Sequence, residues 1–285
     1  MNRYRCPFVC MLSLIMVMLA GCLNTPIEEG MPEQPDPRNN TQPTQPEQEQ
    51  PIPAPAPEQA DPIKEKLETM SIDEKIGQMV IVGLEGYEID ESARDLIETY
   101  KVGGFIFFGR NIKDSNQLIT LVNSLKETNS QHNLPLFLAI DEEGGSVSRL
   151  PPEVRKFPSS RTIAEANSEQ FSYEVGRKIA SLMNSFGMNL NFAPVLDINS
   201  NPNNPVIGDR SFGSSADIVS NLGLSTMRGL ADEQVISVVK HFPGHGDTSV
   251  DSHLGLPVVN HGIDRLKKLE LVPFANAIRH NADAV

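Results

Sequence analysis

Short apolar runs alternate with longer segments of helical periodicity from about residue 63 onward. The apolar runs have the length and β-branched composition of strands in a buried parallel sheet. They are Met79–Gly83, Val102–Phe108, Leu136–Ile140, Leu190–Ala193, Val235–Val239 and Ala282–Val285. The helical segments are Glu91–Tyr100, Ser115–Asn129, Glu169–Phe186, Ala216–Glu233 and Asp264–Asn281. This repetition predicts parallel strands joined by crossover helices, preceded by a helix that begins at the capping box Ser71-Ile72-Asp73-Glu74.

Two architectures fit such a repeat, a doubly wound sheet and a closed (β/α)8 TIM barrel. No Gly-x-Gly-x-x-Gly fingerprint follows the first strand, and polar residues gather after several strands, which favours the barrel. The last strand-like run is cut off at Val285, and residues 63–285 fall short of a typical barrel of about 250 residues. We therefore expect a barrel truncated after about five and a half β/α units, with a natural six-stranded relative as the alternative.

The N-terminal segment has the features of a secretion signal. Arg3 and Arg5 precede an apolar run, and Leu19-Ala20-Gly21-Cys22 resembles a bacterial lipobox. The resemblance implies a signal peptide over residues 1–21, lipidation of Cys22 and an extracytoplasmic protein that is lipid-anchored to the cell membrane. The alternative is an uncleaved anchor, but an apolar run of about 12 residues is short against the roughly 20 needed to span a bilayer. All three cysteines lie in residues 1–22, so the mature chain has no disulfide available.

Residues 22–62 are rich in proline, glutamine and glutamate, and include Pro-Ile-Pro-Ala-Pro-Ala-Pro at 51–57. A segment of this composition buries too little apolar surface to offset its ordering entropy. We expect a disordered linker between the anchor and a globular domain over residues 63–285.

The densest group of chemical side chains is the stretch 240–253, K-H-F-P-G-H-G-D-T-S-V-D-S-H, directly after a predicted strand. Its proline and glycines exclude a helix, and loops at the carboxyl ends of parallel strands are where α/β folds place their sites. Three interpretations stay open from spacing alone: a proton shuttle formed by Asp251 and His253, a plain polar loop, or a metal site. The possible metal ligands are His241, His245, Asp247, Asp251 and His253.

The run K-H-F-P-G-H-G-D-T, followed by D-S-H and L-G-L-P, resembles the signature of glycoside hydrolase family 3 in its β-N-acetylhexosaminidase branch. The resemblance implies a TIM barrel, of which residues 63–285 are the N-terminal part. It also implies His253 as general acid/base with Asp251 as its partner, and Lys240 and His241 as substrate-binding residues. Neither a metal nor another cofactor is implied.

Two further stretches are similar to family motifs. Asp141-Glu142-Glu143-Gly144-Gly145-Ser146-Val147-Ser148-Arg149 resembles Asp-x-Glu-Gly-Gly-x-Val-x-Arg, which implies that Asp141 and Arg149 bind sugar hydroxyls. Gly-Asp-Arg-Ser-Phe at 208–212 implies Arg210 as a substrate contact. From position alone, Asp209 could be the salt-bridge partner of Arg210, and Asp197 is expected to brace its loop.

The family resemblance implies a retaining exo-β-N-acetylglucosaminidase that hydrolyses terminal N-acetylhexosamine from peptidoglycan-derived fragments. Its partner would be an amino-sugar oligosaccharide or muropeptide. The family nucleophile is an aspartate after the seventh strand, which matches no residue here, so we expect the 285-residue chain to be inactive. Alternatives are a catalytically silent sugar-binding lipoprotein, a phosphorolytic family member and a metal-dependent hydrolase.

Composition narrows the partners further. The net charge of −13 and the lack of a lysine-arginine cluster argue against binding to nucleic acid. The chain has no tryptophan and four tyrosines, so long stacking subsites for a polysaccharide are not expected. The oligomeric state is not predicted.

Overall fold

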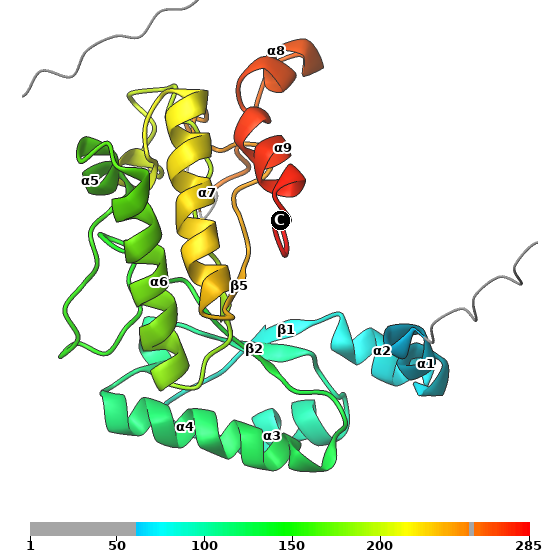
Figure 1. The fold of residues 1–285 in the computed structure, drawn as a ribbon. Coiled ribbons are helices and arrows are strands. Elements are labelled where there is room, and N and C mark those ends of the chain that lie inside the picture. The colour runs from blue at the N-terminus through cyan, green and yellow to red at the C-terminus, as the bar shows by residue number, and fades with distance from the viewer. Residues whose placement is uncertain (1–60, 251–253) are drawn as a thin grey trace, which may run out of the picture. The chain divides into compact units, whose positions relative to one another are not determined.

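The computed structural model describes residues 61–250 and 254–285 (Figure 1). The predicted signal peptide, Cys22 and all but the last two residues of the predicted linker lie outside the described residues, as do Asp251 and His253. None of the helices in this described part combines the length and the hydrophobicity needed to cross a bilayer.

The described residues contain a five-stranded parallel sheet in which each strand pairs with the next strand in the sequence. Its strands are β1 Ile81–Gly83, β2 Gly104–Phe107, β3 Phe137–Ile140, β4 Leu190–Asn191 and β5 Ile236–Ser237. A doubly wound sheet reverses its strand order at a switch point, whereas a barrel wall adds its strands in sequence. The observed order, β1-β2-β3-β4-β5, is that of a barrel wall.

The sixth predicted strand reaches the sheet as one bridge. Ala284 forms a parallel bridge with Val238, and the backbone N–H of Val239 donates to the Ala284 carbonyl at 3.1 Å. The chain therefore returns to the side of β5 where a sixth strand was expected.

The helices follow the predicted order with three differences. They are α1 Pro62–Thr69, α2 Ile72–Gln78, α3 Glu91–Glu98, α4 Ser115–Thr128, α5 Ser160–Glu165, α6 Glu169–Ser185, α7 Ala216–Asp232, α8 Ile263–Lys268 and α9 Val272–Arg279. Helices α1 and α5 were not predicted. The single helix predicted over Asp264–Asn281 is wrong, because α8 and α9 are separate helices and Pro273 lies in the first turn of α9. Proline has no N–H to donate and is tolerated in a first turn but not in a helix interior.

The core lies between the strands and the helices that cover them. Phe105 and Phe107 of β2 and Leu138 of β3 are fully buried. Helices α6 and α7 run side by side (Figure 1), and they approach so closely that a Cβ on Gly176 would lie 2.3 Å from the Thr226 carbonyl oxygen. This packing fixes the neighbouring strands, and with them the loops that follow β3, β4 and β5.

Candidate active site

Polar side chains from three loops meet at the carboxyl ends of β3, β4 and β5. Beyond the strands, Val195 and Lys240 form a parallel bridge, and the N–H of Leu196 donates to the Lys240 carbonyl at 2.6 Å. The backbone after β4 therefore stays beside the backbone after β5. This places Lys240 next to the acidic turn that follows β3.

Glu143 lies at the centre of this cluster. Both of its carboxylate oxygens accept hydrogen bonds from Arg210, which lies in the short 3-10 helix Gly208–Arg210, at 2.8 Å from Nε and 2.9 Å from Nη2. The Lys240 ammonium lies 2.6 Å from Glu143 Oε1 and 2.6 Å from Asp141 Oδ1. Because its side chain is only 2% exposed, Glu143 contacts Arg210 and Lys240 from the buried side of the cluster.

Electrostatics favours the charged forms of this network. Burial acts to raise the pKa of Glu143, but the hydrogen bonds from Arg210 and the charge of Lys240 lower it overall. Burial likewise acts to lower the pKa of Arg210, and its bonds to Glu143 raise it overall. The charged Glu143–Arg210 pair can therefore take part in charge-assisted hydrogen bonds.

His241 joins the cluster to a second buried carboxylate. Its Nδ1 lies 2.5 Å from Asp197 Oδ2, and its Nε2 lies 3.1 Å from Arg210 Nη2. A guanidinium can only donate, so a neutral His241 carries its proton on Nδ1 and accepts at Nε2. Fully buried Asp197 also accepts the backbone N–H groups of His241 and His245, at 3.3 and 2.7 Å. The Asp197 carboxylate therefore braces the loop after β5, and not its own loop after β4 as the sequence suggested.

The next residues of this loop are bound to the loop after β4. Asn204 donates from Nδ2 to the carbonyl oxygens of His245 and Thr248, at 2.9 Å each. Asp247 accepts from Ser200 Oγ at 3.2 Å and pairs with His261 Nε2. The bond to His261 lowers the pKa of Asp247. Asp247 and His261 thus connect the two sides of the segment that carries Asp251 and His253 in the sequence.

Glu142 faces the interior rather than the cluster. It is fully buried, and burial raises its pKa to about 7 against the opposing hydrogen bonds from Ser148 and from backbone N–H groups. One of these donors is the N–H of Arg149, 3.0 Å from Glu142 Oε2. Among the described residues, Glu142 Oε1 has no hydrogen-bond partner.

The structure brings together four of the residues that the sequence singled out: Asp141, Arg210, Lys240 and His241. Arg149 lies on the same turn as Asp141, through its backbone bond to Glu142. The partner suggested for Arg210 was wrong: Asp209 instead accepts from Ser146 Oγ at 3.3 Å, and Glu143 pairs with Arg210.

Glu143 was not singled out, although it occupies the glutamate position of the quoted Asp-x-Glu motif. That match was the available signal for it. The Asp247–His261 pair had none, because nothing in the sequence relates two residues on either side of a long loop.

In the part of the chain that is described, no group of three or more histidine, cysteine or carboxylate side chains converges as a metal site. The imidazole rings of His241 and His245 meet edge to face with ring centroids 5.9 Å apart. The Nδ1 atom of His245 is bonded to Thr248 Oγ1 at 2.6 Å. The absence of a metal from the protein stays a prediction.

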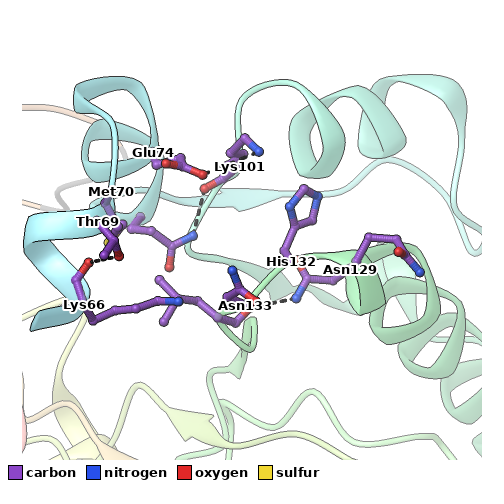
Figure 2. A pocket seen from close by; sticks show the side chains of 11 residues that line it. Lys66, Thr69, Met70, Glu74, Lys101, Asn129, His132 and Asn133 are labelled. Atoms are coloured by element: carbon purple, nitrogen blue, oxygen red, sulfur yellow. Dashed lines mark hydrogen bonds and ion pairs between the residues drawn. The ribbon is translucent and has the colours of Figure 1, made fainter. Parts of the chain in front are cut away.

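A separate polar pocket of about 220 Å³ opens elsewhere on the domain (Figure 2). Lys66 and Glu74 line it from the N-terminal helices, and Lys101 and His132 line it from the loops before β2 and β3. These loops enter the amino ends of the strands. The pocket therefore lies at the opposite edge of the sheet from the cluster around Glu143.

A parallel α/β barrel with its charged cluster at the carboxyl ends of the strands is the architecture of a large class of barrel enzymes. The chain belongs to glycosyl hydrolase family 3: the family described as "Glycosyl hydrolase family 3 N terminal domain" matches residues 71–285. The family resemblance and the TIM-barrel class expected from the sequence are thereby confirmed.

Individual relatives agree. Beta-hexosaminidase A of Pseudoalteromonas piscicida is 44% identical over 191 residues, which are 65% of this chain and 32% of that protein. A solved family 3 beta-N-acetylglucosaminidase from Paenibacillus sp. str. FPU-7 is 44% identical with a TM-score of 0.73, over 75% of this chain and 41% of that one.

NagZ from Neisseria gonorrhoeae, solved in complex with N-trifluoroacetyl-D-glucosamine, is 32% identical with a TM-score of 0.65. The similarity covers 71% of this chain and 60% of NagZ. The chain thus spans between about a third and three fifths of the lengths of these relatives.

Proposed function

We propose that this chain contributes the sugar-binding wall of a retaining exo-β-N-acetylglucosaminidase that removes terminal N-acetylhexosamine from peptidoglycan-derived fragments. The observation that carries the proposal is the cluster of Asp141, Arg210, Lys240 and His241 around buried Glu143, in a chain of this family. Paired charges of this kind match sugar hydroxyls, which both donate and accept hydrogen bonds. The names of the relatives, beta-hexosaminidase and beta-N-acetylglucosaminidase, support an amino-sugar substrate.

In the proposed reaction the residues divide into binding and proton transfer. Asp141 and Arg149 accept and donate hydrogen bonds at sugar hydroxyls, and Lys240, His241 and Arg210 complete the subsite. His253 protonates the leaving oxygen while a carboxylate attacks the anomeric carbon, and His253 then activates water in the second step. Asp251 stabilises the imidazolium form. The roles of His253 and Asp251 rest on the family resemblance, since both residues lie outside the described residues.

The same proposal predicts that these 285 residues do not turn over substrate alone, because none of their aspartates matches the family nucleophile. The test compares release of 4-nitrophenol from its N-acetyl-β-glucosaminide by this chain and by a chimera completed with the remaining barrel strands of NagZ. We expect turnover only from the chimera, and a sharp loss of turnover in its His253→Ala variant. Turnover by the 285-residue chain would contradict the assignment of the nucleophile.

Binding of the sugar is tested on the chain itself by titration calorimetry with N-acetylglucosamine and, as a control, glucose. We expect N-acetylglucosamine to bind and Lys240→Ala to weaken it at least tenfold, since charged hydrogen bonds contribute about 1.5–3 kcal/mol. Equal affinity of wild type and Lys240→Ala would remove the cluster from substrate binding. Sugar binding in a chimera that never hydrolyses would favour the catalytically silent alternative.

We also propose that the protein is extracytoplasmic and anchored by lipid at Cys22, as the lipobox-like sequence suggests. Metabolic labelling with an alkyne fatty acid in a bacterial host tests this. Label is expected in the wild type and in Cys10→Ala, and is expected to disappear in Cys22→Ala. Equal labelling of the two variants would rule out Cys22 as the attachment point.

A further inference from the structure

The turn that follows β3 is built around the side chain of Glu142. The N–H of Glu143 donates to the Val147 carbonyl at 3.0 Å, and Gly144 and Val147 form an antiparallel bridge. The turn thereby folds back over the residue that precedes it. Gly144 has φ +81°, a conformation that side-chain-bearing residues rarely adopt, which is what allows this reversal.

The carboxyl group of Glu142 binds the far end of this turn. Its Oε2 accepts the backbone N–H of Arg149 at 3.0 Å. The carboxyl group thus holds the end of the turn that carries Arg149. A carboxylate is suited to this position because it only accepts.

Glu142 itself is fixed from the opposite side by β4. Asn191, fully buried, accepts the Glu142 N–H at its Oδ1 and donates from its Nδ2 to the Glu142 carbonyl, both at 3.0 Å. This two-way bond fixes the Glu142 backbone in register with β4. The carboxyl group is therefore attached to a rigid strand and not to the turn that it organises.

The surroundings of Glu142 isolate it from solvent and from other charges. It borders a small cavity of about 10 Å³ under the charged cluster, lined by residues of the sheet and of helices α5, α6 and α7. Glu143 is the other ionisable group among the residues that line this cavity, and it is paired with Arg210 and Lys240 on the cluster side. None of the remaining lining residues is ionisable; each is either apolar or polar and neutral.

We infer that Glu142 is a positioning residue for sugar binding: through its buried carboxyl group it holds the turn of residues 144–150, and with it Arg149, in the substrate-binding arrangement. The inference rests on the proposed role of Arg149 as a sugar contact. It assigns Glu142 no contact with the sugar. The affinity for the sugar is therefore expected to change when the buried carboxyl group of Glu142 gains or loses its charge.

A direct test follows the backbone amide of Arg149 by NMR in the ¹⁵N-labelled 285-residue chain between pH 5 and pH 9. Because burial raises the pKa of Glu142 to about 7, the wild-type amide signal is expected to move with a midpoint near that pH. Glu142→Gln is neutral throughout and is expected to remove the movement. Glu127→Gln, an exposed glutamate on α4, is the matched control and is expected to titrate as the wild type does.

The second readout is the affinity for N-acetylglucosamine at pH 6 and pH 8. We expect wild-type affinity to fall about threefold at pH 6, where one acceptor of the turn is protonated, and Glu142→Gln to have the lower affinity at both pH values. An Arg149 amide that moves identically in wild type and Glu142→Gln would overturn the inference, as would a wild-type amide that does not move.

This design distinguishes failure of the proposed function from failure of the inference on Glu142. Failure of the wild type to bind sugar would contradict the proposed function, while the amide titration still decides whether Glu142 organises the turn. If Glu142→Gln does not fold, Glu142→Asp retains the charge on a shorter side chain. That variant is expected to keep a titration with a displaced midpoint, and an unchanged midpoint would again overturn the inference.

Discussion

Arg210 donates from Nε and Nη2 to the two carboxylate oxygens of Glu143, a residue 67 positions earlier in the chain. This bidentate pair joins the 3-10 helix that follows the long loop after β4 to the acidic turn after β3. The same carboxylate receives Lys240 from the loop after β5. One buried glutamate therefore fixes the relative positions of three loops, and its removal has consequences for both stability and binding.

Glu143→Ala is expected to destabilise the domain strongly. Removing one partner of a buried ion pair leaves an uncompensated charge, which costs about 3–5 kcal/mol. Urea unfolding followed by circular dichroism measures the difference. The control is Glu127→Ala on the exposed face of α4, for which a change within about 0.5 kcal/mol is expected. A loss below about 1 kcal/mol in Glu143→Ala would show that the cluster is solvated.

Arg210→Lys keeps the charge but loses the two-pronged contact with Glu143 and the bond to His241 Nε2. Lysine presents a point charge and cannot reproduce that planar geometry. We expect affinity for N-acetylglucosamine to fall about tenfold, the effect of one lost charge-assisted hydrogen bond. Calorimetry compares this variant with Arg279→Lys, an exposed control on α9. Equal affinities would place Arg210 outside the binding machinery.

The order of strands and helices could be predicted because apolar periodicity is a local signal. All five strands fall within predicted runs, and helices α3, α4, α6 and α7 fall within predicted segments. The single helix predicted over Asp264–Asn281 was wrong because the periodicity was followed across Pro273. A proline has no N–H for the helical hydrogen bond, so it lies in the first turn of a separate helix. The resemblance to family motifs, rather than periodicity, identified Asp141, Arg210, Lys240 and His241 as candidate site residues.

The partners of these residues could not be predicted, because pairing depends on which loops the barrel brings together. Asp209 is adjacent to Arg210 in the sequence, yet Glu143 is adjacent in space. Burial is equally non-local. Glu142 and Glu143 are neighbouring glutamates, but their pKa values move in opposite directions because only Glu143 faces two cations.

The raised pKa of Glu142 predicts a specific pH dependence of stability. Its folded pKa of about 7 lies above its unfolded value of about 4.5, so the folded state binds the extra proton between these values. The contribution is fully present below pH 4.5 and is lost as the pH rises through 7, with an upper bound of about 3 kcal/mol. Urea unfolding at pH 5 and pH 7.5 is expected to show a smaller decrease in Glu142→Gln than in wild type. Parallel decreases would contradict a raised pKa.

The pH dependence of stability expected from Asp247 has the opposite sign to that expected from Glu142. Its pKa is lowered, with the hydrogen bond to His261 as the largest cause, so its contribution to stability is present above its unfolded pKa of about 3.9 and is lost as the pH falls through the folded value. In His261→Ala the pKa of Asp247 is expected to rise towards its ordinary range. A ¹³C titration of the carboxyl group measures this. The control His280→Ala removes an exposed imidazole bonded to the Asn276 carbonyl and is expected to leave the Asp247 titration unchanged.

Gly246 offers a test of how closely the loop after β5 must approach the loop after β4. A Cβ at this position would lie 1.8 Å from the Ile198 carbonyl oxygen, a contact that no rotamer can relieve because both atoms are fixed to the backbone. Gly246→Ala must therefore displace the loop, which weakens the hydrogen bond from the His245 N–H to Asp197. We expect a loss of stability of about 1–3 kcal/mol, typical of overpacking, together with weaker binding of N-acetylglucosamine. Gly109→Ala is the matched control, since a Cβ there meets nothing within 4 Å. If Gly246→Ala binds the sugar as tightly as the control does, the separation of these two loops does not determine the geometry of the site.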